Sequence, residues 1–369
     1  MSTLKVDNIR HNSATSDAIT MASDGTCTAK VTNPLSNRRL NYNGAMLINQ
    51  RGDSSNISAF SSYYGPDRYF SQGNASLNGT WNIGQSTDVP DGYGFKYSLS
   101  YDCVATTSNA NRYLMTVYRM EGVDCQLLNY GTANAKTVTL SFWIKCNKAG
   151  NFQVNFENEQ NPDAGYQTQQ TINSAGQWEK KVVTIPGDTT KALTFGTQKA
   201  FCFDIVYSAF GSYASQTPTA AWSALANEQR GTHCNMDLFD STSNYVRITG
   251  VQLELGDHAT DFEHLPYSDE LRRCQRYYEE TYYMDDAGGS YVRGPVYWKV
   301  EKRASGSPIV HAKRPDGVGT DTANKMYQGS GERDAQCVYS WTGGTMVNNT
   351  GSFNANQDII GRVSIDVEI

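Results

Sequence analysis

Apolar and polar residues alternate along several stretches in the middle of the chain. Between Val138 and Cys146 every second residue is apolar, and the same holds between Phe95 and Cys103. A period of two is typical of a strand with one buried face. The pattern predicts seven strands, at residues 95–103, 112–120, 138–146, 152–156, 178–185, 201–207 and 245–255. Two sheets packed face to face accommodate such strands, so we expect a mainly β fold, with a jelly-roll β-sandwich over residues 37–266.

The predicted strand at residues 245–255 changes phase in its middle. Its apolar residues occupy even-numbered positions before Thr249 and odd-numbered positions after Gly250. A regular strand with this pattern would turn half of its apolar side chains to solvent. One extra residue in the strand restores a single apolar face, so we predict a β-bulge or sharp bend at Thr249 and Gly250.

After Pro266 the spacing of the apolar residues changes to three and four. Leu271, Cys274 and Tyr278 follow this spacing, and Ser268 is a suitable N-cap residue ahead of two acidic residues. The pattern predicts one connecting α-helix over residues 267–284.

Both flanks of the chain contain short apolar alternations. Residues 1–36 carry Leu4, Val6 and Ile9 among polar turn formers, which indicates an extended arm whose strands find a partner in another chain or particle. Residues 285–369 contain further candidate strands, at 290–300, 309–312, 336–341 and 359–368. This small β-rich C-terminal domain would have a thin core, so association between copies is a plausible source of its stability.

Composition and charge narrow the functional classes. The 369 residues carry a net charge of -6, which argues against a nucleic-acid partner because the phosphate backbone requires a basic face. No apolar run is long enough to insert into a membrane, and the N-terminus lacks a signal-peptide core, so we expect a soluble protein made in a cytoplasm. Cysteines are scattered without zinc-site spacing, which favours small buried thiols at Cys103, Cys146 and Cys202.

Motifs that suggest catalysis are weak in this chain. A Gly52-Asp53-Ser54 run, followed much later by Asp261 and His264, imitates a serine esterase, but no alternating strand and helix pattern follows Ser54. Glu157, Glu159 and Asp163 could suggest the carboxylate pair of a glycosidase, but carboxylates on a solvent-facing strand are common without a catalytic role. His233 and His311 are isolated in the sequence and do not suggest a site. We therefore expect neither an enzyme nor a metal site.

A binding face has better support. If the apolar residues of strands 138–146 and 152–156 point inward, then Trp143, Gln153, Asn155 and Glu157 share the outer face. A flat ring can stack on the C–H face of a sugar, while amides and carboxylates can bind its hydroxyl groups. The alternative is that a loop or a neighbouring subunit covers Trp143. Further candidates for glycan contact, in polar loops, are Tyr166 and Trp222.

Five separated blocks of the chain carry a family resemblance. They are MSTLKVDNIRHNSATSDAITMASDG, LNYNGAMLINQRGDSS, TVTLSFWIKCNKAGNFQVNF, AGQWEKKVVTIPGDTTKAL and ITGVQLELGDHATDFEHLPYSDELRRCQRYYEE. In this order they resemble tail-fibre or fibre-like virion proteins of tailed, especially marine, bacteriophages. The resemblance implies a particle-attaching arm, a jelly roll similar to carbohydrate-binding modules, a variable C-terminal region and a homotrimer. It transfers no site residue. A structural calcium ion near Asp257 or Asp261 would fit such a module, although no loop has recognisable ligand spacing.

These observations lead to one functional hypothesis and two alternatives. The hypothesis is a non-enzymatic virion protein, assembled in the host cytoplasm, that acts as a trimeric tail fibre or receptor-binding protein and adheres to host cell-surface polysaccharide. In the trimer, the stripe of Leu271, Cys274 and Tyr278 would face sister helices. One alternative is a head-decoration fibre or tail adaptor that binds only other virion proteins. The other is a polysaccharide depolymerase, which the absence of a fixed-period repeat disfavours.

Overall fold

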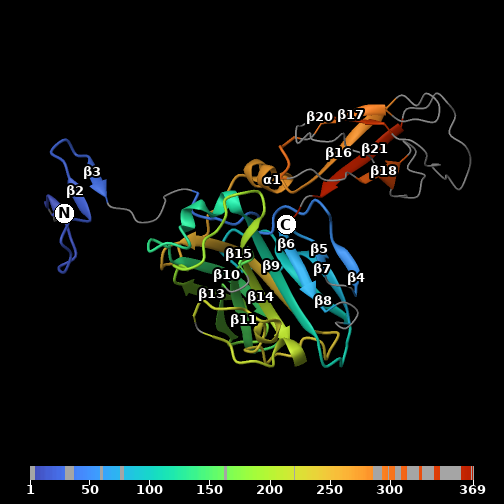
Figure 1. The fold of residues 1–369 in the computed structure, drawn as a ribbon, viewed down its shortest axis with the longest axis horizontal. Helices are drawn as coiled ribbons and strands as arrows, with labels where there is room; N and C mark the ends of the chain where they lie inside the picture. Colours follow the sequence, from blue (N-terminus) through green and yellow to red (C-terminus); the bar gives the residue numbers. More distant parts are fainter. Residues whose placement is uncertain are drawn as a thin grey trace, which may run out of the picture.

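The fold is described from a computed structural model of the chain. The described residues are 5–29, 37–58, 61–74, 79–161, 164–219, 221–285, 293–297, 299–303, 309–313, 324–325, 336–340, 359–366 and 368. The predicted arm, the sandwich and parts of the C-terminal region therefore all include residues with a defined backbone, and the sandwich is covered almost throughout (Figure 1).

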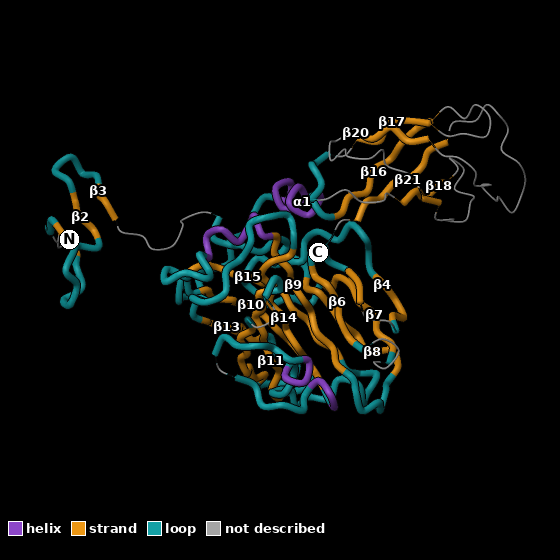
Figure 2. Tube along the Cα trace, viewed as in Figure 1, coloured by secondary structure: helices purple, strands orange, loops and turns teal. Residues whose placement is uncertain are grey.

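Two six-stranded antiparallel sheets form the main body of the molecule, which confirms the predicted sandwich (Figure 2). Sheet 1 has the order β13 (Glu179–Ile185), β10 (Val138–Cys146), β15 (Tyr245–Leu255), β8 (Ser98–Ala105), β7 (Thr80–Ser86) and β4 (Ser54–Ile57). Sheet 2 has the order β12 (Gly165–Ile172), β11 (Gly150–Asn158), β14 (Lys199–Ala209), β9 (Tyr113–Glu121), β6 (Tyr69–Gly73) and β5 (Ser61–Tyr63). The chain crosses several times from one sheet to the other, for example between β10 and β11, as in a jelly roll.

The apolar faces of the two sheets meet in a single core. Phe142 of β10 and Phe152 of β11 lie edge to face with ring centroids 6.2 Å apart, although they come from different sheets. Tyr101 of β8 and Tyr207 of β14 meet at 5.7 Å with their rings tilted by 54°. Aromatic pairs in this geometry add about 1 kcal/mol to the free energy gained by burial. The inward residues are therefore those that the period-two pattern selects.

The predicted bulge is present in β15. Ser141 lies opposite Gln252 and Trp143 lies opposite Thr249, so two residues of β15 face the single residue between them on β10. Gly250 occupies the bulge with φ +62°, a conformation that is costly for any residue with a side chain. Because of this extra residue, the apolar side chains on both sides of the bulge point into the core.

The helix after Pro266 is shorter than the sequence pattern predicts. Helix α1 comprises Tyr267–Gln275, so Ser268 lies inside its first turn and is not the N-cap. The segment Tyr278–Asp285 is a strand, β16, which pairs antiparallel with β21 (Ile359–Asp366). The prediction was wrong because tyrosines spaced by four residues also satisfy the period of two, and pairing with a distant strand decides between the two structures.

The trimer stripe is also corrected by the structure. Cys274 is fully buried and Tyr278 is 8% exposed within one chain, while Leu271 is half-buried. Two of the three side chains therefore pack against their own chain and are not available to sister helices.

The arm and the C-terminal region are small sheets outside the sandwich. In the arm, β1 (Asn8–Ile9), β2 (Ile19–Met21) and β3 (Cys27–Ala29) form a three-stranded meander, and the side chains of Val6, Ile9 and Met21 are exposed. In the C-terminal region, β18 (Ile309–Lys313) joins β21 and β19 (Asn324–Lys325), and β17 (Arg293–Tyr297) pairs with β20 (Gln336–Ser340). Strands β17, β18, β20 and β21 overlap the four that the sequence predicts there, whereas β19 was not predicted.

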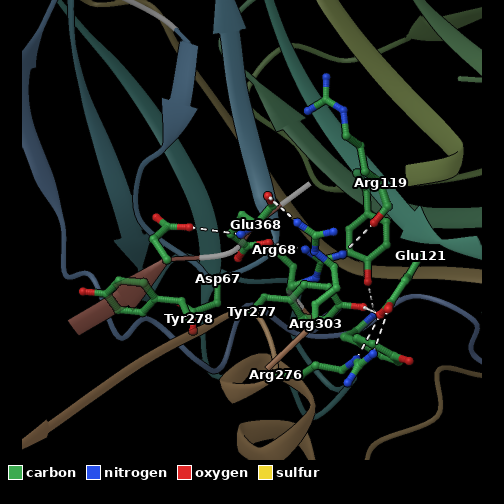
Figure 3. A network of polar contacts seen from close by, with 12 residues as sticks. Asp67, Arg68, Arg119, Glu121, Arg276, Tyr277, Tyr278, Arg303 and Glu368 are labelled. Atoms are coloured by element: carbon green, nitrogen blue, oxygen red, sulfur yellow. Dashed lines mark hydrogen bonds and ion pairs between the residues drawn. The ribbon is translucent and has the colours of Figure 1, made fainter. Parts of the chain in front are cut away.

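A buried polar network joins the sandwich to α1 and to Glu368 (Figure 3). Arg68, 1% exposed, pairs with Glu368 and lies 3.5 Å from the centroid of the Tyr277 ring. Glu121 at the end of β9 accepts bonds from Arg276 at 2.7 and 2.9 Å and from the Tyr277 hydroxyl at 3.0 Å. The network fixes the helix against the sandwich (Figure 3).

Cys103, Cys146 and Cys202 are buried free thiols, as predicted. Burial raises the pKa of Cys103 and of Cys146 to about 11. In the part of the chain that the structure describes, no helix combines the length and apolar character needed to cross a membrane.

Candidate functional site

The four residues predicted to share one outer face lie on opposite sides of the sandwich. Trp143 belongs to β10 in sheet 1, whereas Gln153, Asn155 and Glu157 belong to β11 in sheet 2. The prediction took consecutive strands as neighbours in one sheet. In this topology the chain crosses to the other sheet between them, so their outer faces point in opposite directions.

The amides on sheet 2 serve to hold a covering segment. We call residues 211–219 and 221–235 the strap. Gln153 donates to the carbonyl of Gln229 at 2.8 Å and accepts from the backbone N–H of His233 at 3.0 Å, and Asn155 donates to the carbonyl of Arg230 at 3.0 Å. Both amide side chains are fully buried as a result. Neither is available to a ligand while the strap is in this position.

Glu157 forms part of an ionic cluster beneath the strap. Arg230 donates to Glu157 through both terminal nitrogens, one bond measuring 2.9 Å, and to Asp204 at 2.8 Å. Burial alone would raise the pKa of Glu157, but the bonds from Arg230 hold it below its usual value. Burial, together with the neighbouring Glu157 charge, raises the pKa of Asp204 well above normal. Among the described residues, the one group with metal-ligand types close together is Glu157, Cys202 and Asp204, and the Arg230 guanidinium already supplies its positive charge.

Tyr166 and Trp222 form a separate cluster at the β12 edge of sheet 2. Their ring centroids are 5.6 Å apart, and Trp222 lies at the same distance from Tyr130. The indole nitrogen of Trp222 donates to the carbonyl of Pro186 at 2.8 Å. Both predicted residues are half-buried, and their contacts are those of a packed loop.

Trp143 lies on the outer face of sheet 1 beside an exposed tyrosine. The rings of Trp143 and Tyr93 have centroids 4.4 Å apart and are tilted by 49°. Tyr93 is 54% exposed, whereas Trp143 is half-buried. A loop residue thus covers Trp143 in part and adds an accessible ring beside it.

Charged groups surround these rings. Asp88, in the segment between β7 and β8, accepts from the Lys145 ammonium at 3.0 and 2.8 Å and from the Trp178 indole nitrogen at 3.0 Å. Burial alone would raise the pKa of Asp88, but these two donors lower it below the usual value. Arg247 lies 3.7 Å from the same carboxylate, donates to Asp102 at 2.9 Å and rests 4.3 Å from the centroid of the Tyr245 ring.

We call this surface the Trp143 face and define it by residues that lie on, or fold over, the outer side of β13, β10 and β15. Of its members the sequence pattern identified only Trp143. Tyr93 and Asp88 come from a loop whose path the pattern does not predict. Trp178 directly precedes β13, and pairing of β13 with β10 would have placed it here. The members are Asp88, Tyr93, Trp143, Lys145, Trp178, Lys180 and Arg247.

The remaining candidates have structural roles or lie outside the described side chains. Glu159 accepts from Arg119 at 3.0 and 3.1 Å and from Lys199 at 3.2 Å, so it belongs to a salt-bridge group. His264 packs against Phe95 and bonds the carbonyl of Tyr93. Asp257 contacts His258, and neither Asp257 nor Asp261 joins a group of metal-ligand side chains among the described residues. Asp163 and the side chain of His311 are outside the described part.

No protein-family model and no curated protein matches the chain. Solved structures with a similar fold include the enzymatically active domain of tailspike protein 4 of bacteriophage CBA120, at 10% identity and a TM-score of 0.31 over 55% of this chain and only 21% of that one. A putative sugar-binding protein from Bacteroides thetaiotaomicron matches at 13% identity and 0.30, over 59% of this chain and all of that one. The CBM22-2 xylan-binding domain from Paenibacillus barcinonensis Xyn10C matches at 13% and 0.28, over 51% and 92%. Scores this low describe likeness of the sandwich and carry no information about ligands.

The Trp143 face combines groups of the kind that can stack on a sugar ring and bind its substituents. An exposed ring beside a second ring offers an apolar platform, and the exposed Lys180 lies beside it, next to Lys145, Asp88 and Arg247, which are paired largely with one another. The strap side of the sandwich offers mainly groups that are already bonded to the chain itself. Accessible aromatic and charged groups therefore lie on the Trp143 face, whereas those of the opposite face are covered by the strap.

Proposed function

We propose that the chain is a non-enzymatic virion protein, a bacteriophage tail fibre or receptor-binding protein, that adheres to host surface polysaccharide through the Trp143 face. The observation that carries the proposal is the pair of Tyr93 and Trp143, whose rings lie 4.4 Å apart on an outer sheet face with Tyr93 54% exposed. Two neighbouring rings with one of them exposed form a small apolar patch, and contiguous apolar patches on a surface often mark a binding site. The virion assignment rests on the resemblance of the sequence blocks.

A single face of this kind binds weakly, because a sugar ring buries little area on two side chains. Adhesion then depends on the number of copies. Linked sites have effective concentrations in the millimolar range, so three chains in one fibre, and several fibres on one particle, multiply the apparent affinity. The proposed homotrimer and the attachment of the arm to other virion proteins supply this multiplication.

The test is binding to a panel of bacterial surface polysaccharides, measured by glycan microarray and then by calorimetry. Tyr93→Ala removes the exposed ring without opening the core, and we expect at least about a tenfold loss of affinity. Trp143→Phe keeps an aromatic ring but reduces its area, so a smaller loss is expected. Tyr267→Ala is the matched control, because Tyr267 is an equally exposed tyrosine, at 58%, on helix α1.

Two results would count against the proposal. If no polysaccharide binds, or if binding is the same for Tyr93→Ala and Tyr267→Ala, the face is not a glycan site, and contact with other virion proteins becomes the better explanation for its rings. If the chain lowers the viscosity of a capsular polysaccharide that it binds, it is a depolymerase and the non-enzymatic assignment is wrong.

A further inference from the structure

The charges of the Trp143 face are largely paired with one another. Lys145 is held by Asp88, and Arg247 is held by Asp102 and lies near Asp88. The Asp88 carboxylate shows what this face can hold: an acidic group bound by an ammonium at 2.8 Å and by an indole N–H at 3.0 Å. The chain fills this position itself, so a ligand must use the cation that remains.

Among the residues that define the Trp143 face, Lys180 is that cation. It lies directly opposite Trp143 in the pairing of β13 with β10, and residues paired in this way point to the same face with Cβ atoms about 5 Å apart. Its side chain is exposed, and it has no carboxylate partner among the described residues. The next residue, Lys181, is by contrast paired with Glu179 at 2.6 Å.

We propose that the Trp143 face is specific for acidic polysaccharides, with the Lys180 ammonium binding a uronate carboxylate or a sulfate group while the rings of Trp143 and Tyr93 contact the sugar. The inference rests on the proposed glycan-binding function and adds the charge of the ligand to it. One exposed carboxylate, Asp91, lies in the same loop as Tyr93 and opposes this charge. Removing it therefore improves the binding of an acidic ligand.

The experiment compares the full-length protein on two sets of immobilised polymers. The acidic set is alginate, polygalacturonate, hyaluronate and chondroitin sulfate, and the neutral set is dextran, galactan and xylan. We expect binding to at least one acidic polymer and a loss of about three- to tenfold with Lys180→Gln. Asp91→Asn should strengthen binding to the same polymer. Lys136→Gln is the matched control, because Lys136 is also exposed but lies ahead of β10, seven residues away from Trp143.

The outcomes separate this inference from the function on which it rests. Binding to neutral polymers that is lost with Tyr93→Ala leaves the proposed function intact and overturns the specificity for acidic ligands. Acidic binding that is equally weakened by Lys180→Gln and Lys136→Gln, with no effect of Tyr93→Ala, is non-specific charge attraction and overturns both. Failure to bind either set also counts against both. Acidic binding that requires both Tyr93 and Lys180 supports both.

Discussion

At the scale of single residues, Gly250 supports both the sandwich and the Trp143 face. Its φ of +62° is strained for residues with a side chain, and a Cβ atom would lie 2.6 Å from Phe95 and 3.1 Å from Trp143. We predict that Gly250→Ala lowers the free energy of unfolding by about 2 kcal/mol or more, through backbone strain and overpacking. It should also weaken glycan binding, because Trp143 must move. Urea unfolding and calorimetry measure the two effects.

Gly196→Ala is the control for this substitution, since a Cβ atom there would have no neighbour within 4 Å. It should change the stability by no more than a few tenths of a kcal/mol. Equal effects of the two substitutions would mean that the bulge at Gly250 does not constrain the strand.

The buried carboxyl of Asp67 should make the stability of the protein depend on pH. Asp67 is fully buried beside Gln50 and Arg51, and burial raises the pKa of its carboxyl to about 6. The unfolded value is about 3.9. Because the folded pKa is the higher one, the protonated carboxyl favours the folded state below pH 4, and this contribution disappears as the pH rises towards 6. Relative to Asp67→Asn, the wild type should lose about 2 kcal/mol of stability between pH 4 and pH 7.

Chemical unfolding of both proteins at several pH values measures this difference. The comparison with Asn cancels the contributions of other groups, since Asn keeps an acceptor for the backbone N–H of Gln50. A stability difference that is constant across this range, or that grows in favour of the wild type as the pH rises, would contradict the prediction.

For the strands, the sequence pattern identified which residues face inward more successfully than which strands are neighbours in a sheet. Strands β10 and β15 agree with the predicted bounds, and the change of phase located the bulge, because both depend on local alternation. The pattern could not assign β10 and β11 to different sheets, because the inward-facing residues of a strand recur at every second position in either sheet. The predicted binding face therefore included Trp143, which does lie on the outer side of sheet 1. It also wrongly included Gln153 and Asn155, which lie on sheet 2 and hold the strap.

Distant pairing also explains the error at the helix. Tyr278 follows α1 at helical spacing, but its hydroxyl bonds Glu280 at 2.8 Å and its ring lies 3.9 Å from the Arg51 guanidinium. Arg51 is far away in the sequence and also binds Asp366 at 2.9 Å. A local pattern of apolar residues carries no information about contacts between residues so far apart in the sequence. For this reason neither the end of the helix nor the start of β16 could be predicted.

The prediction at this scale is that Arg68 and Glu368 act as one unit in joining β6 to the end of the C-terminal sheet. Both side chains are almost fully buried, and Glu368 also forms an ion pair with Arg51 at 3.4 Å. Arg68→Met leaves part of the Glu368 charge without a partner, so we expect a loss of about 3 kcal/mol or more. The double variant Arg68→Met/Glu368→Leu should lose less than the sum of the single losses, by at least about 1 kcal/mol.

A double-mutant cycle in urea measures this coupling. As a control, Lys199→Met removes a salt bridge to Glu159 whose lysine is half exposed, and its loss should be small. If the stability losses of Arg68→Met and Glu368→Leu were strictly additive, the two residues would not act as one unit.

At the scale of the whole molecule, the buried positions of Cys274 and Tyr278 remove helix α1 as the centre of the proposed trimer. The arm offers a different contact. Its meander of three short strands leaves Val6, Ile9 and Met21 exposed, and a sheet this small does not bury an apolar face by itself. Association of three arms would cover these side chains. We therefore predict that deleting residues 1–36 converts a trimer into monomers, whereas Leu271→Ser on helix α1 leaves the trimer intact.

Light scattering coupled to size-exclusion chromatography measures the molar mass of each variant and shows whether it is a monomer or a trimer. Retention of glycan binding in solution shows that the shortened chain is still folded, because the Trp143 face lies wholly within the sandwich. On an immobilised polysaccharide, however, the shortened chain should dissociate at least about a hundredfold faster, since the linked sites are lost. A full-length chain that is already monomeric contradicts the trimer. A trimer that survives the deletion but dissociates with Leu271→Ser would return the contact to helix α1.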